Sequence, residues 1–186
     1  MRKLILVVHT SLDGYVASPE GELSGFDASE ENLEFVCKLT EDADAALFGR
    51  KSYELINGAW PTAKDKPGAS PGEIAYSNWY NRADKIVISK TLKTAPGNTK
   101  IISLNIVAEV LRIKNEPGQS ILIFGSPAVA QLLMNADMID DYWIFINPSI
   151  FGKGIPLFAP LNNTSKLKLL ATQQFQNGEI ALHYVR

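Results

Sequence analysis

The sequence predicts an α/β protein with a mostly parallel central sheet, flanking helices and an antiparallel C-terminal hairpin. The parallel part is indicated by two apolar runs, 45–48 and 121–124, each followed at once by a glycine and a helix-forming segment. An apolar run without alternation is typical of a strand buried on both faces of a sheet. The hairpin is indicated by Asn177-Gly178, a preferred pair for a tight turn, between the strand-like segments 168–175 and 179–185.

Composition limits the class of protein. With 186 residues, 46% of them hydrophobic, the chain is long enough for a single domain with a sizeable core, which we expect to span residues 1–186. A net charge of −2 gives no electrostatic basis for binding nucleic acid or an anionic membrane. No apolar run reaches the length of a membrane span, and the N-terminal run leads into polar residues without a signal-peptide cleavage site. Cys37 is the only cysteine, so we expect no internal disulfide and a cytoplasmic location.

The other elements are predicted from apolar periodicity and from the residues that typically begin and end helices and strands. Further strands are predicted at 3–9, 15–17, 85–89, 100–102 and 142–146. Ser70 and Glu73 have capping-box spacing with proline at the first helical position, which predicts a helix to about residue 81. Asp27 and Glu30 have the same spacing before a helix whose inner stripe we expect to be Leu33, Val36, Cys37 and Thr40. Asn105 is expected to cap a helix through 114 with Val107, Val110 and Leu111 turned inward.

The first strand–glycine–helix unit suits an anion. Gly49 ends the run, and Arg50 and Lys51 open a segment of good helix formers. Free N–H groups and the positive end of the helix dipole meet at such a helix start, and arginine can fork onto a phosphate. An ordinary turn with two solvated cations would give the same residues, so both interpretations stay open.

The second unit repeats this arrangement. Gly125 ends the run 121–124, Ser126 is expected to be the N-cap, and Pro127 occupies the first helical position. Two such units in one small chain suggest a single phosphate-bearing ligand held between two helix starts.

Other chemistries find little support in the residues. His9 and His183 are the only histidines, and neither lies in a G-x-S-x-G or H-E-x-x-H context. Together with Cys37 they show no metal-ligand spacing, so we expect no metal site. The P-loop and G-x-G-x-x-G patterns are both absent. A phosphate-ester hydrolase therefore lacks an identifiable base or metal.

Four segments, in the right order along nearly the whole chain, resemble a known family. Residues 49–54, GRKSYE, resemble the G-R-x-[ST]-[WY]-E segment of dihydrofolate reductases, and 86–89 and 123–126 look like two of their strands. Residues 11–17, SLDGYVA, are closer to the reductase domain of riboflavin biosynthesis, the C-terminal domain of the bifunctional deaminase–reductase. Residues 147–158 match its P-x-x-x-G-x-G-x-P-L-F pattern. The resemblance implies a dihydrofolate reductase-like fold and, as a family property, a homodimer.

The resemblance implies an NADPH site. Four residues at the first helix start would hold the pyrophosphate and the 2′-phosphate side of the adenosine: Gly49, Arg50, Lys51 and Ser52. Ser89 and Lys90 would lie by the adenine ribose, and Val16 and Ala17 would flank the nicotinamide. The second helix start would face the pyrophosphate with Gly125, Ser126, Pro127 and Ala128.

The substrate side is less specific. Asp13 follows the first strand and is a candidate catalytic residue, although it could simply cap its own turn. Glu31, a helix acid four residues before Phe35, is the second catalytic candidate, although helix acids commonly lie on solvated faces. The candidate substrate-binding residues are His9, Trp60 and Phe151, of which the two aromatic residues could instead fill the core.

These observations favour an NADPH-dependent reductase of a small heterocyclic, pterin-like or pyrimidine-like substrate. The resemblance offers 5-amino-6-(5-phosphoribosylamino)uracil as the nearest named substrate. Two alternatives remain: a true dihydrofolate reductase, and a non-catalytic nucleotide-binding module of the same fold, which the lack of a convincing proton donor would favour.

Overall fold

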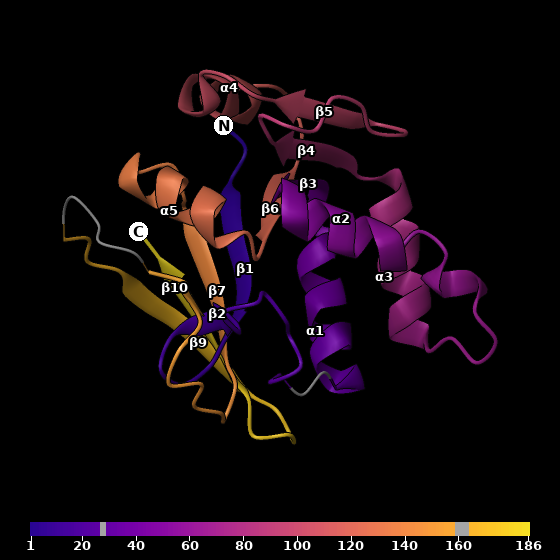
Figure 1. The fold of residues 1–186 in the computed structure, drawn as a ribbon, viewed down its shortest axis with the longest axis vertical. Coiled ribbons are helices and arrows are strands. Elements are labelled where there is room, and N and C mark those ends of the chain that lie inside the picture. Colours follow the sequence, from indigo (N-terminus) through magenta and orange to yellow (C-terminus); the bar gives the residue numbers. More distant parts are fainter. Residues whose placement is uncertain (27–28, 159–163) are drawn as a thin grey trace. The chain divides into compact units, whose positions relative to one another are not determined.

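The structure is a computed structural model that describes residues 1–26, 29–158 and 164–186. Its helices and strands alternate over most of the chain and end in a hairpin (Figure 1). The strands are β1 (Leu4–Thr10), β2 (Tyr15–Ala17), β3 (Ala43–Gly49), β4 (Asp84–Ile88), β5 (Thr99–Ile102), β6 (Ser120–Phe124), β7 (Asp141–Ile146), β8 (Ile155–Pro156), β9 (Lys168–Gln174) and β10 (Ile180–Val185). The helices are α1 (Glu30–Glu41), α2 (Arg50–Ala59), the short 3₁₀ helix η1 (Ala63–Asp65), α3 (Pro71–Arg82), α4 (Ile106–Lys114) and α5 (Pro127–Asn135).

Eight of the strands form one sheet in the order β5-β4-β3-β6-β1-β7-β10-β9. The pairs β3–β4, β4–β5 and β1–β7 are parallel, whereas β10 runs antiparallel to both β7 and β9. The predicted fold class, a mostly parallel sheet with helices and an antiparallel C-terminal hairpin, is therefore confirmed. The strands β2 and β8 form a separate antiparallel pair.

The described residues divide into two compact units, the first made of residues 1–2 and 29–122, the second of 3–26, 123–158 and 164–186. In the first unit, α1 packs against α3 and β3, and α2 contacts β3 and β4 (Figure 1). The side chains of Ala45, Ala46, Leu47 and Phe48 are fully buried. Full burial of a phenylalanine or leucine stabilises a fold by about 1.5–3 kcal/mol, so this run anchors the first unit.

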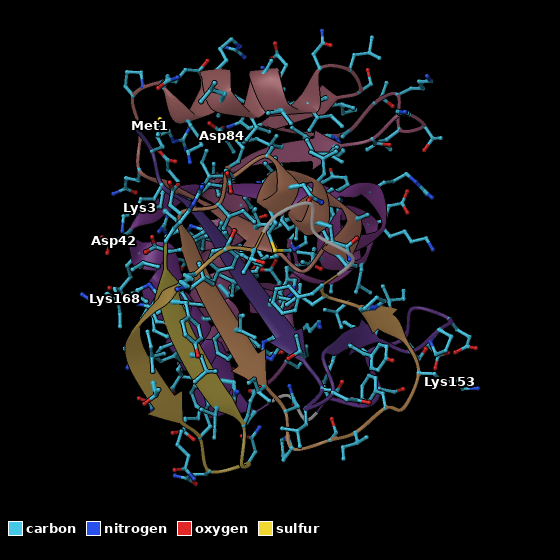
Figure 2. The ribbon with its side chains drawn as sticks, turned by 90° about the vertical axis from the view of Figure 1, so that its left-hand side faces the viewer. Met1, Lys3, Asp42, Asp84, Lys153 and Lys168 are labelled. Carbon is cyan, nitrogen blue, oxygen red and sulfur yellow. The ribbon has the colours of Figure 1, made fainter. Side chains whose placement is uncertain are left out.

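In the second unit, the strands β1, β7, β10 and β9 are neighbours, and β2 contacts β1. The core contains Leu4 and Leu6 on β1 and Phe145 on β7, all of them fully buried. The loop that joins β7 to β8 extends outward at Lys153 (Figure 2). In the described part of the chain, no helix is long and apolar enough to cross a membrane.

The helix starts agree with the sequence in part. Ser70 and Glu73 form the predicted capping box at the start of α3. Ser126 and Asn105 occupy N-cap positions, but both adopt left-handed backbone conformations and neither makes a side-chain cap. The sequence therefore predicted the N-cap positions correctly, but the expected hydrogen bond from the cap side chain is not formed at either helix. The cap of α1 is Ser29, whose hydroxyl accepts from the N–H of Asn32, while the predicted cap Asp27 lies outside the described residues.

The inward faces of two helices differ from prediction. On α4, Val110 and Ile113 are buried, whereas Val107 and Leu111 are 38% and 43% exposed, so the predicted stripe was wrong at those two positions. On α1, Val36 and Thr40 are buried as expected, together with Asn32. The 3.6-residue period was read correctly, but it does not fix which of two adjacent faces is covered.

Candidate active site

The start of α2 lies directly at the end of β3. Gly49 is the N-cap in an extended conformation without a side-chain cap, and the first turn holds no acidic residue. Arg50 pairs with Glu54 on the same helix, its Nη1 lying 2.9 and 3.0 Å from the two carboxylate oxygens. Both side chains are more than two-fifths exposed, so this pair is weak and an anion can compete for Arg50.

Ser89 and Lys90 follow the neighbouring parallel strand. Gly49 on β3 is in register with Ile88 on β4, so the chain leaves both strands at the same level of the sheet. The Ser89 hydroxyl accepts hydrogen bonds from the N–H groups of Thr91 and Leu92, which closes a tight turn. Lys90 is exposed. The first unit thus brings Ser89 and Lys90 together with the start of α2.

The start of α5 belongs to the second unit. The N–H of Gly125 donates to Val7 O on β1 at 3.1 Å, and Gly125 and Ser126 have positive φ angles of 55° and 53°. Left-handed backbone costs a residue with a side chain about 1–2 kcal/mol. The Ser126 hydroxyl donates to Phe124 O instead of capping the helix. As in α2, the first turn, which includes Pro127 and Ala128, holds no acidic residue.

Val16 and Ala17 are buried on the short strand β2. Ala17 is in register with Ile155 of β8, and a Cβ added to Gly154 would lie 2.3 Å from Ala17 O. The backbones of Gly154 and Ala17 approach too closely for a side chain to fit between them. This explains why a glycine precedes β8 in the segment 147–158.

Asp13 ties two loops together. Its carboxylate accepts hydrogen bonds from the Ser11 hydroxyl at 2.6 Å and from the N–H groups of Phe151 and Gly152 at 3.1 and 2.8 Å. These contacts, the Ser11 hydroxyl above all, lower the pKa of Asp13 below its ordinary value. Through these hydrogen bonds Asp13 connects the turn after β1 to the loop after β7, and its catalytic assignment stays a prediction.

His9, near the end of β1, is hydrogen-bonded to a carboxylate that comes from the far end of the chain. Its Nδ1 lies 2.7 Å from Oε1 of Glu179, which directly precedes β10. The amide Nδ2 of Asn147 donates to the same oxygen at 2.5 Å. Glu179 is fully buried, whereas the His9 side chain is 39% exposed. A buried carboxylate behind a half-exposed imidazole is an arrangement suited to proton transfer.

Phe26 connects two of the candidate substrate-binding residues. The Phe26 ring lies 6.5 Å from His9 and 5.1 Å from Phe151 between centroids. Gly25 also packs on Phe151, since a Cβ there would lie 2.4 Å from the ring. The second unit therefore gathers His9, Phe151 and the Asp13 turn near one another.

Glu31 and Trp60 belong to the first unit. Glu31 lies half-buried in the first turn of α1. Trp60 is the C-cap of α2, and its ring lies 4.4 Å from that of Tyr76, which is buried. Trp60 therefore packs partly on the aromatic core of its unit, and its role toward a substrate stays a prediction.

A cavity of about 110 Å³ lies away from these residues, at the carboxyl end of α5 and the start of β7. Its lining includes Met134, Tyr142 and Phe158. Small-molecule sites usually measure about 300–1,000 Å³, so this cavity is too small for a dinucleotide. In the described part of the chain, no cluster of His, Cys, Asp and Glu residues could hold a metal ion.

Sequence reasoning missed Glu179, Asn147 and Phe26. Glu179 was assigned only to a hairpin strand, and an acidic residue after a turn normally faces solvent. It contacts His9 across 170 positions of the chain, a separation that no local pattern can reveal. Asn147 lies in the glycine-rich segment 147–158, but nothing in that local pattern indicates a partner for its side chain.

Comparisons with known proteins find relatives that match nearly the whole chain. The chain is 27% identical over 183 residues to the uncharacterized protein YyaP of Bacillus subtilis, covering 98% of this chain and 94% of the relative. It is 28% identical over 186 residues to the uncharacterized protein YwjB of the same organism, covering 100% and 98%.

Two solved structures share the fold. A putative riboflavin biosynthesis protein from Shewanella sp. PV-4 has a TM-score of 0.69 at 22% identity, covering 99% of this chain and 98% of that one. A dihydrofolate reductase from Enterococcus faecalis, complexed with NADP(H), has a TM-score of 0.66 at 17% identity, covering 99% and 96%. The family model of the RibD C-terminal domain matches residues 2–181. The chain therefore belongs to the RibD C-terminal domain family.

Proposed function

We propose that this chain is an NADPH-dependent reductase of a small heterocyclic substrate that carries a polarised C=N or C=O bond. The observation that carries the proposal is the pair of helix starts, at Gly49–Ser52 and Gly125–Ala128, each reached from a strand through a glycine. Neither has a side-chain cap or an acidic residue in its first turn. Family membership and the likeness to riboflavin-biosynthesis and dihydrofolate-reductase folds support a reductase.

The donor set fits an anionic dinucleotide. Backbone N–H groups at an uncapped helix start bind phosphate oxygens, and the first turns of α2 and α5 hold no acidic residue to repel them. Arg50 and Lys51 add positive charge in the first unit, with Arg50 the better match to a 2′-phosphate because its guanidinium can donate two parallel hydrogen bonds.

When bound, NADPH supplies a hydride from C4 of its nicotinamide ring. The chain's own residues would bind and orient the two reactants: Val16 and Ala17 beside the nicotinamide, and Ser89 and Lys90 beside the adenine ribose. Phe151 and Trp60 are proposed to contact the substrate, and Asp13 and Glu31 remain proposed catalytic residues. Binding in this way contributes chiefly by positioning the reactants and excluding water.

The test is a titration of the protein with NADPH and, separately, NADH, followed by quenching of its three tryptophans. We expect micromolar NADPH binding and NADH binding at least about tenfold weaker, as loss of one charge-assisted contact implies. Absence of binding to either nucleotide would overturn the cofactor assignment.

Turnover is tested by the loss of NADPH absorbance with 5-amino-6-(5-phosphoribosylamino)uracil and with dihydrofolate. Oxidation with the first compound supports the reductase proposal, and preference for the second would favour a dihydrofolate reductase. NADPH binding without oxidation by either would favour a non-catalytic module.

Assembly and location are part of the same proposal. We expect a cytoplasmic homodimer, as the family resemblance implies. Sedimentation velocity at micromolar concentration should then show a species of twice the chain's mass, and a purely monomeric species would contradict the dimer.

A further inference from the structure

Glu179 is a buried acidic residue to which the proposed function assigns no role. Its Oε1 accepts a hydrogen bond from Asn147 Nδ2 at 2.5 Å and lies at hydrogen-bond distance, 2.7 Å, from His9 Nδ1. Its Oε2 is buried and has no hydrogen-bond partner among the described residues. Burying a carboxylate with one oxygen unsatisfied costs free energy, so packing alone does not account for this residue.

The hydrogen bonds define the orientation and the tautomer of His9. As a carboxylate, Glu179 has only acceptor oxygens, so the hydrogen in its contact with His9 is the one on Nδ1. The imidazole also stacks on Phe145, with 4.6 Å between centroids and 26° between planes. The ring is thus held from two sides. Nε2 is the other ring nitrogen, and it has no hydrogen-bond partner among the described residues.

We propose that His9 is the proton donor of the reduction and that Glu179 is its positioning residue. The proposal rests on the reductase function proposed above. The hydride adds to the carbon of the substrate's C=N or C=O bond, and the electron pair of that double bond moves to the nitrogen or oxygen. The Nε2–H of the His9 imidazolium then gives its proton to that atom, leaving neutral imidazole with Nδ1–H still bonded to Glu179. Water returns the proton to Nε2 before the next turnover.

The chain contains its own matched control. His183 is the only other histidine, and it too contacts a buried carboxylate, with 3.2 Å between its Nε2 and Asp141 Oδ2. However, its side chain is only 17% exposed, it stacks on Trp143, and its Nε2 is the nitrogen already engaged. Asp141 also keeps Lys3 as a partner at 3.1 Å, so removing His183 does not leave this carboxylate unpaired.

The kinetic test compares the variants His9→Gln, Glu179→Gln and His183→Gln in NADPH oxidation with 5-amino-6-(5-phosphoribosylamino)uracil and with dihydrofolate. We expect His9→Gln to lower kcat by about 10²–10⁴, as loss of a general acid does, while KM and NADPH affinity stay within about threefold. Glu179→Gln should lower kcat by on the order of tenfold, the scale seen for residues that orient a functional histidine. His183→Gln should leave kcat unchanged. Equal kcat for His9→Gln and His183→Gln would overturn the proposal.

His9→Gln removes one of the two side-chain partners of buried Glu179, leaving Asn147, and could fail to fold. The double variant His9→Gln/Glu179→Gln removes the buried charge, and it should fold and show the same loss of kcat. A double variant with wild-type kcat would overturn the proposal.

A second measurement does not depend on turnover. Nitrogen-15 NMR of the two imidazoles, assigned with His183→Gln, should show neutral His9 as the Nδ1–H tautomer, and Glu179→Ala should shift it toward Nε2–H. An Nε2–H tautomer in the wild-type protein would overturn the proposed geometry. If the wild type binds NADPH but reduces neither compound, the reductase function fails, whereas the NMR result still reports separately on the pair of His9 and Glu179.

Discussion

The carboxylate of Asp13 accepts a hydrogen bond from the backbone N–H of Gly152 at 2.8 Å, although 139 residues separate the two. The N–H of Phe151 donates to the same carboxylate at 3.1 Å. One side chain therefore fixes the turn after β1 to the loop after β7, within the second unit. The motif that resembles the family at residues 11–17 and the glycine-rich motif at 147–158 are parts of one local structure.

Replacing Asp13 should loosen this connection. Asp13→Asn offers one acceptor oxygen and an amide N–H that cannot accept from a backbone N–H, so the amides of Phe151 and Gly152 should lose protection against hydrogen exchange. Glu20→Gln is a suitable control because the carboxylate of Glu20 accepts a hydrogen bond from Ser18 within an exposed loop. Unchanged protection in Asp13→Asn would show that other contacts hold the loop.

The same carboxylate predicts a dependence on pH. The Ser11 hydroxyl, followed by the backbone N–H groups, lowers the pKa of Asp13 in the folded protein. Its contribution to stability is therefore present above the unfolded-state value of about 3.9 and is lost as the pH falls through the folded-state pKa. Protection of Phe151 and Gly152 should decline in that acidic window in the wild type, and this decline should be absent in Asp13→Asn.

Gly154→Ala should destabilise the fold, because its Cβ would lie 2.3 Å from the backbone oxygen of Ala17. Overpacking of this kind typically costs about 1–3 kcal/mol. Gly58→Ala is the matched control: Gly58 lies in α2 with no atom within 4 Å of an added Cβ, and alanine should stabilise the helix by about 0.5–1 kcal/mol. Urea unfolding measures the stability of both variants. Equal midpoints for the two variants would contradict the close approach of Gly154 to the backbone oxygen of Ala17.

Arg50→Ala should weaken NADPH binding by on the order of tenfold or more, the value of a lost charge-assisted hydrogen bond, and should leave NADH binding nearly unchanged. Glu54→Gln should strengthen NADPH binding by a small factor because it frees Arg50 from its partner. Arg112→Ala is a control, since Arg112 is likewise an exposed helix arginine paired with glutamates. Fluorescence titration of the folded variants provides the measurement, and an unchanged NADPH affinity in Arg50→Ala would refute the assignment.

Lys85→Met should stabilise the first unit. Lys85 is 8% exposed, its Nζ lies 4.7 Å from the centroid of the Tyr80 ring, and burial lowers its pKa. At neutral pH the buried cation carries a desolvation cost that the cation–π contact offsets by about 0.5–2 kcal/mol. Because the pKa of Lys85 is lower in the folded than in the unfolded state, the desolvation cost of the charged form disappears as the pH rises toward the unfolded-state pKa, and the wild type becomes more stable. The gain in Tm from Lys85→Met should thus be largest near neutral pH and should shrink in alkaline buffer.

Local sequence predicted the elements well where one short segment carried the whole signal. The run 45–48 and the capping box of Ser70 and Glu73 appear as expected, because burial on both faces and a three-residue spacing are local properties. Prediction was weaker at Ser126. There the turn of the backbone after Phe124 places the residue in a left-handed conformation, which removes its hydroxyl from the helix start. The exposed Val107 and Leu111 show the same limit for a helix face.

The sequence by itself determined the fold class, the family and the two glycine-led helix starts, because strand burial, turn preference and backbone freedom act within a few residues. Only the tertiary structure decided that His9 meets Glu179 and Asn147, and that Asp13 meets Gly152. The physical reason is that hydrogen-bond geometry depends on strand order and register. β1 must lie beside β7, and β7 beside β10, before a residue near the start of the chain can reach one near its end.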